Sequence, residues 1–132
     1  MSGTITHEWN LTQLVFMHGE ETKYEQKLQV SEVEKGDTYL RYTEALDEHE
    51  IKVTVRLGDS FVKLKRSGII NMNFHFEEGA TTDTFYDSPA CRHHFEIVTH
   101  ELKTDDGLLK VKYDLFESGA LLGKYKYTLE RI

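Results

Sequence analysis

The sequence has only one cysteine and one proline among its 132 residues. The cysteine, Cys91, cannot form a disulfide within the chain, so stability has to come from a packed core. The proline, Pro89, follows Asp87 and Ser88, where it indicates a turn. Because proline cannot donate to a β-ladder, its absence elsewhere is typical of a chain in which strands continue unbroken.

Long apolar runs and an excess of basic residues are also missing. No run approaches the roughly 20 apolar residues that a membrane-spanning helix needs, and residues 1–10 contain no apolar signal segment. There are 16 basic and 23 acidic residues, which gives a formal net charge of −7. A chain this acidic, with no basic stripe, is a poor candidate for binding nucleic acid or an anionic membrane. We therefore expect a cytoplasmic protein with neither of these partners.

Segments in which apolar and polar residues alternate one by one are, by contrast, abundant. In residues 70–76 the apolar Ile, Met and Phe residues interleave with Asn and His, which gives a β-strand one apolar face and one wet face. Similar segments recur between turn signals spaced ~8–12 residues apart. In the last segment the alternation places Leu121 inside and Leu122 outside. The pattern predicts an all-β fold, a single antiparallel meander barrel of about 8–10 strands that forms one domain, residues 1–132.

Several short motifs in the last two-thirds of the chain are similar to those of a known family. They are Tyr42-Thr43-Glu44, residues 62–68 (VKLKRSG), Phe76-Glu77-Glu78-Gly79, Tyr86-Asp87-Ser88-Pro89, Thr99, Lys112-Tyr113-Asp114-Leu115 and Gly123-Lys124-Tyr125. Through them, residues 39–132 resemble the YwiB-like family of bacterial proteins with a calycin-type, lipocalin-like β-barrel. Ala90-Cys91 departs from the family pattern, which has a glycine in the turn after the proline. The resemblance implies a fold and no activity, because the family has none established.

Within the predicted strands, some polar residues occupy the same alternate positions (the same parity, odd or even) as the apolar residues, which places them inside the predicted barrel. They are Gln26, Tyr42, Glu44, Arg66, Thr82, Thr84, Tyr86, Thr99, Tyr113, Tyr125 and Tyr127. Arg66 and Glu44 are the only opposite charges in this set. A buried charge is costly unless it is paired, so we expect the two either to meet or to lie at a barrel mouth. The purely structural interpretation is a hydrogen-bonded network with the tyrosine hydroxyls.

The functional interpretation is a cavity for a small amphipathic or carboxylate-bearing ligand. A barrel of about eight strands can be just filled by side chains or just hollow enough for one small molecule. Arg66 would hold the carboxylate, because its planar fork of donors suits that group. The candidate ligand-binding residues are Arg66, Glu44, Tyr42, Tyr86, Thr99, Tyr113 and Tyr125.

An enzymatic alternative uses part of the same set. Some calycin-like barrels, for example phenolic-acid decarboxylases, are enzymes that use two tyrosines, an arginine and a glutamate. In this chain Tyr42, Tyr86, Arg66 and Glu44 would have to surround one solvent-reachable cavity to anchor a carboxylate and move a proton.

A third interpretation is a non-catalytic structural or partner-binding barrel with a filled core. Phe85, Phe116 and Leu122 have the outward parity. If they cluster on neighbouring strands, they would form a surface for a protein partner or for a homodimer. The sequence leaves open whether the protein is a monomer or a homodimer.

The histidines and the cysteine complete the inventory of reactive side chains. His93 and His94 are adjacent, so they point to opposite faces of a strand, and no spacing among the seven histidines resembles a metal site. We expect no metal, no cofactor and no catalytic residue. Cys91 lies beside Arg92 and His93, and nearby cations can make a thiol reactive. The sequence favours an unremarkable thiol near the start of a strand.

Overall fold

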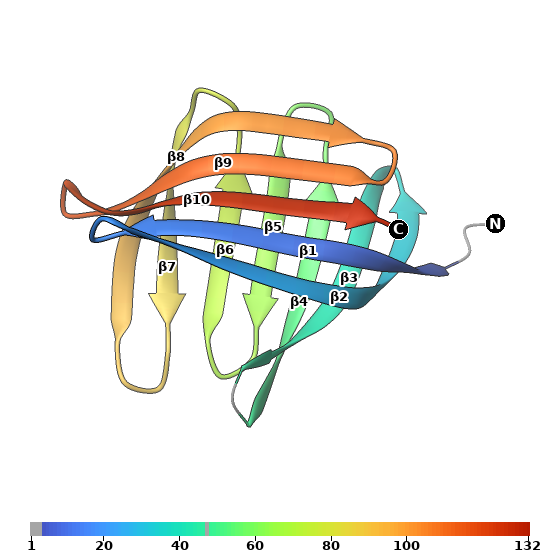
Figure 1. The fold of residues 1–132 in the computed structure, drawn as a ribbon, viewed down its shortest axis with the longest axis horizontal. Helices are drawn as coiled ribbons and strands as arrows, with labels where there is room; N and C mark the ends of the chain where they lie inside the picture. The colour runs from blue at the N-terminus through green and yellow to red at the C-terminus, as the bar shows by residue number, and fades with distance from the viewer. Residues whose placement is uncertain (1–3, 47) are drawn as a thin grey trace.

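The computed structural model describes residues 4–46 and 48–132, which form ten antiparallel strands (Figure 1). The strands are β1 (Ile5–Met17), β2 (Glu20–Lys35), β3 (Asp37–Leu46), β4 (His49–Leu57), β5 (Val62–Ser67), β6 (Asn71–Phe76), β7 (Thr81–Asp87), β8 (Arg92–Asp105), β9 (Leu108–Glu117) and β10 (Ala120–Arg131). Asp47, which lies between β3 and β4 in the sequence, is outside the described residues.

Each strand pairs with its neighbours in the sequence, and the sheet closes between the first and last strands. In Figure 1, β1 lies between β2 and β10. Its register with β10 runs from Trp9↔Arg131 to Phe16↔Lys124. Closure leaves no complete edge strand for pairing with other chains. The prediction of an all-β, closed antiparallel meander barrel is confirmed. Within the described residues there is no helix with the length and apolar character of a membrane span.

The core consists of the inward faces of the strands, as the alternation predicts. Along β4, Ile51, Val53 and Val55 are buried, whereas Lys52 is exposed. Trp9 is also buried, and the centre of its ring lies 5.9 Å from the Arg131 guanidinium carbon. Burying an aliphatic or aromatic side chain contributes about 1.5–3 kcal/mol, so the inward face supplies most of the driving force for folding.

A β-bulge reverses the inward and outward assignment at the start of β10. The register with β9 shifts between Leu121 and Gly123, and the inserted residue changes which face each side chain meets. Leu121 is therefore 47% exposed, and Leu122 packs against the core. Both were predicted the other way round. The outward patch predicted from Phe85, Phe116 and Leu122 thus loses one member.

The prediction for Gln26 is also wrong, because Gln26 is exposed. Residues 20–27 of β2 are all exposed, and within the described chain β2 pairs with β3 over residues 31–35. The first half of β2 therefore extends beyond the closed part of the barrel with β1 as its partner. Alternation in sequence gives the faces of a strand but not where the barrel ends along it.

Two hairpin tips have the backbone that a tight turn requires. His18-Gly19 joins β1 to β2 and Ser118-Gly119 joins β9 to β10, and all four residues have positive φ values between 51° and 81°. A two-residue type I′ turn needs positive φ at both positions, and it matches the twist of the flanking strands. The second turn fixes Glu117 at the last position of β9.

Candidate functional site

Arg66 and Glu44 form an ion pair on the inner face of the barrel. Arg66 on β5 donates from Nη2 to Oε2 of Glu44 on β3 over 2.9 Å, across the intervening β4. Their side chains are 27% and 13% exposed, respectively. The expectation that the two charges meet is confirmed, and pairing compensates for much of the cost of removing them from water.

Two tyrosines beside this ion pair join strands that are not neighbours. The hydroxyls of Tyr42 on β3 and Tyr127 on β10 lie 2.7 Å apart, and both residues are buried. Burial raises the pKa of both hydroxyls, and the nearby Glu44 carboxylate raises it further. Both groups are therefore neutral around pH 7, each able to donate and to accept a hydrogen bond.

Aromatic rings form another part of the interior, contributed by β6, β9 and β10. Tyr113 on β9 lies 4.8 Å from Phe76 and 5.9 Å from Phe74, measured between ring centroids, and it stacks on Tyr125 at 5.0 Å. Burial also raises the pKa of Tyr113. These rings add apolar surface to a site whose charged groups are Arg66 and Glu44.

The same interior contains a cavity of about 70 Å³. It is lined by Gln13, Tyr42, Glu44, Leu64, Arg66, Phe74, Phe76, Tyr113 and Tyr127. A water molecule takes about 30 Å³ of the liquid, so the cavity has room for about two waters or one very small organic molecule. Sites for drug-sized ligands measure about 300–1,000 Å³.

One donor of a residue that lines this cavity has no partner among the described residues. It is Nε–H of Arg66, which is fully buried although Nη2 of the same guanidinium binds Glu44. A buried donor without a hydrogen bond costs about 1–3 kcal/mol, so this position favours any molecule that brings an acceptor.

Three of the predicted site residues do not line the cavity. Tyr125 is half-buried and donates to Met17 Sδ over 3.8 Å. Thr99 is fully buried beside a bulge in β8, and its hydroxyl has no partner among the described residues. Tyr86 packs against Phe95 instead, with 6.3 Å between ring centroids. The arrangement required for a decarboxylase-like site therefore lacks its second predicted tyrosine.

The prediction of site residues missed Gln13 and Tyr127, which are neighbours across β1 and β10. Tyr127 had the correct inward parity, and so did Gln13, which shares the parity of the buried Leu11. The missing information was the level of each residue along the barrel axis, which depends on strand register.

The fold resembles that of a solved structure over nearly its whole length. The crystal structure of the YwiB protein from Bacillus subtilis has a TM-score of 0.80 and 20% sequence identity, covering 98% of this chain and 93% of that one. A second structure is the tesB protein MAP1729c of Mycobacterium avium subs paratuberculosis. It has a TM-score of 0.25 and 7% sequence identity, and the match covers 98% of this chain and 80% of that one. The first likeness is one of fold, and the second is too low to relate the two structures.

No curated protein matches the sequence. Residues 10–129 match the family described as "Domain of unknown function (DUF1934)". This match covers nearly the whole barrel, and together with the fold of YwiB it confirms the resemblance drawn from the sequence motifs. The chain is a member of the DUF1934 family, with a YwiB-like β-barrel.

Proposed function

We propose that the barrel binds a small carboxylate-bearing molecule in the cavity beside Arg66. The observation that carries the proposal is the buried Nε–H of Arg66, which has no partner among the described residues, in a side chain that lines a cavity together with three tyrosines. A carboxylate would accept from Nε–H, and its second oxygen would accept from a tyrosine hydroxyl. A cytoplasmic metabolite is the source that we propose, in keeping with a single, unbridged cysteine.

The size of the cavity limits the ligand. A volume of about 70 Å³ admits a molecule of the size of acetate and not a long amphipathic chain. Of the two ligand classes expected from the sequence, the carboxylate-bearing one is therefore favoured. The rings of Phe74 and Phe76 provide an apolar surface for its short carbon chain.

The charge of Glu44 makes this binding dependent on pH. A ligand carboxylate at Nε would lie close to the Glu44 carboxylate at Nη2. Two carboxylates that share one site repel each other, so one of them retains a proton. We expect binding to take up a proton and the affinity to rise as the pH falls.

Calorimetric titration with formate, acetate, propionate and benzoate tests the proposal. Binding of the smallest acids, lost in Arg66→Gln and retained in Arg56→Gln, is the expected result. The control removes an arginine whose pair with Asp37 lies at the surface (2.7 Å, side chains 41% and 25% exposed). Equal affinities of the two variants, or no binding of any acid to folded protein, would contradict it.

A filled barrel with a structural or partner-binding role is the second candidate function. It is favoured by the small volume of the cavity and by the hydrogen bond between Tyr42 and Tyr127 across the interior. Native mass spectrometry distinguishes the two candidates. A small molecule retained in the native spectrum and lost on denaturation supports the binding role. A bare dimer, or a complex with a second protein, supports the alternative.

A further inference from the structure

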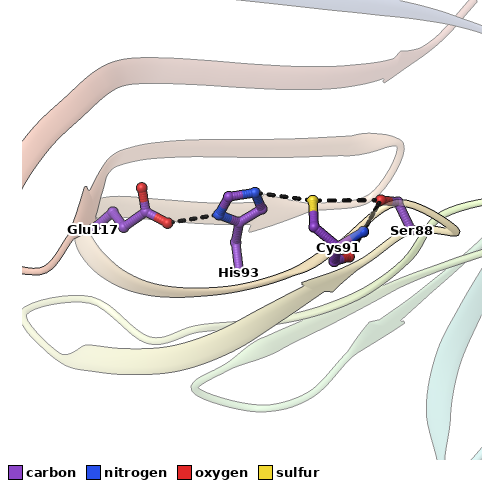
Figure 2. Close-up of polar contacts among 4 residues, drawn as sticks. All are labelled: Ser88, Cys91, His93 and Glu117. Atoms are coloured by element: carbon purple, nitrogen blue, oxygen red, sulfur yellow. Dashed lines mark hydrogen bonds and ion pairs between the residues drawn. The ribbon is translucent and has the colours of Figure 1, made fainter.

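A second group of reactive side chains lies outside the barrel interior, where the β7–β8 turn meets the end of β9. Cys91 is exposed in the turn, His93 is the second residue of β8, and Glu117 is the last residue of β9 (Figure 2). Cys91 Sγ lies 3.1 Å from His93 Nε2, and His93 Nδ1 lies 2.8 Å from Glu117 Oε2. Strand pairing thus brings a nucleophile, a base and a carboxylate into one line.

The carboxylate determines which nitrogen of the histidine faces the thiol. Glu117 can only accept when it is ionised, so His93 donates to it from Nδ1. In a neutral imidazole the other nitrogen, Nε2, then carries a lone pair directed at Cys91 Sγ. The His93 ring also stacks on the Phe95 ring, with 5.7 Å between the ring centroids and 4° between the ring planes, and this contact helps to fix its orientation. A nucleophile beside a base that is oriented by a third group is the arrangement of an activated nucleophile.

Arg92, the other cation next to Cys91 in the sequence, is engaged elsewhere. Its Nε lies 3.0 Å from Asp87 Oδ1, and its guanidinium carbon lies 4.0 Å from the centre of the Phe85 ring. The contacts to the Cys91 sulfur come from His93 Nε2 and, at 3.8 Å, from Ser88 Oγ. His93 is therefore the group that can take the thiol proton.

The turn also indicates which reaction suits this thiol. Acyl transfer needs N–H donors aimed at a developing oxyanion. Here the Cys91 N–H donates to Ser88 Oγ over 3.3 Å, and the Ser88 N–H donates to the Cys91 carbonyl over 3.0 Å. Attack on a disulfide needs no such donors, because the negative charge leaves on sulfur.

We propose that Cys91 is a site of thiol–disulfide exchange with low-molecular-weight disulfides, with His93 as its base. The Cys91 thiol transfers its proton to His93 Nε2, and Sγ bonds to one sulfur of the disulfide. The disulfide's own S–S bond breaks, and the departing thiolate takes the proton from His93. The products are one mixed disulfide on Cys91 and one small thiol. Because the chain has no second cysteine, the mixed disulfide persists until an external thiol reverses the exchange.

The test follows mixed-disulfide formation with oxidised glutathione by intact mass spectrometry. An ordinary thiol, with a pKa of about 8.5, is only a few per cent ionised at pH 7. We expect His93→Gln to react about tenfold more slowly than the wild type at pH 7 and at a similar rate at pH 9.5, where any thiol is ionised. Glu117→Gln, which removes the positioning carboxylate, should show a smaller slowing with the same dependence on pH.

His94→Gln is the matched control. His94 is the next residue, and it forms a similar pair with a carboxylate, Nε2 to Asp83 Oδ1 at 2.8 Å, in which the thiol does not take part. A rate at pH 7 that is the same in the wild type and all three variants would overturn the proposal. If His93→Gln does not fold, the comparison of Glu117→Gln with His94→Gln decides the question in the same way.

Discussion

The hydroxyl groups of Tyr42 on β3 and Tyr127 on β10 lie 2.7 Å apart, and they connect two strands that are separated in the barrel by β1 and β2. Replacing Tyr127 by phenylalanine leaves the Tyr42 hydroxyl buried without this partner, which should cost about 1–2 kcal/mol of the free energy of unfolding. The double variant, Tyr42→Phe with Tyr127→Phe, should cost less than the sum of the two single changes, because it leaves no orphaned hydroxyl. Urea denaturation measures the three values, and strict additivity would contradict this account.

The same burial predicts how stability changes in alkali. Tyr42, Tyr113 and Tyr127 have pKa values raised above the ordinary value of 10.0, mainly by burial. Their stabilising contribution is complete below about pH 10 and is lost as the pH rises above it, because the unfolded chain then releases protons that the folded chain retains. Each tyrosine should lower the free energy of unfolding by about 1.4 kcal/mol per pH unit in this range. Urea denaturation between about pH 9 and 11.5 measures the slope. The slope should become shallower in Tyr113→Phe, and an unchanged slope in this variant would contradict the prediction.

The ion pair inside the barrel should matter more for stability than one at the surface. Glu44→Gln leaves the charge of Arg66 partly buried without its partner, which should cost about 1–2 kcal/mol. Asp37→Asn, which removes the partner of Arg56 at the surface, should change stability little. Thermal unfolding of the two variants in the same buffer provides the comparison. A larger loss of stability in Asp37→Asn than in Glu44→Gln would show that the inner ion pair does not contribute more to stability than the surface pair.

The turn between β9 and β10 gives a test that involves the backbone alone. Gly119 has φ of +81°, and a Cβ built there has no atom within 4 Å. Gly119→Ala should therefore cost about 1 kcal/mol through backbone conformation and not through a clash. Ser118→Asn should stabilise the turn, because asparagine adopts positive φ more readily than serine. Chemical denaturation of both variants should give shifts of opposite sign, and shifts of the same sign would show that the turn is not the cause.

Much of the fold followed from the sequence because alternation and turn residues act locally. The apolar face of residues 70–76, in and next to β6, needed no knowledge of distant contacts. The bulge at Leu121 could not be predicted, since it depends on the register between β9 and β10. Parity is conserved along a strand only until such an inserted residue changes it.

The candidate sites show the same division between local and distant information. Parity placed Arg66 and Glu44 on the inner face and made their meeting a reasonable expectation. It could not place Tyr86 relative to the cavity, because this depends on how far each strand is shifted along the barrel axis. The alignment of Cys91, His93 and Glu117 was likewise hidden, because the carboxylate is 24 residues away from the histidine in the sequence.

The first half of β2 has a consequence for the protein in concentrated solution. Within the described residues, its pairing with β3 is confined to residues 31–35, so residues 20–27 have one side of the backbone open to solvent. Such an open edge invites strands of other molecules to add to the sheet and to start aggregation. This stretch carries Glu20, Glu21, Lys23, Glu25 and Lys27, and a charged edge discourages that addition. The charged residues in the first half of β2 thus protect the barrel from aggregation at the place where its sheet is least complete.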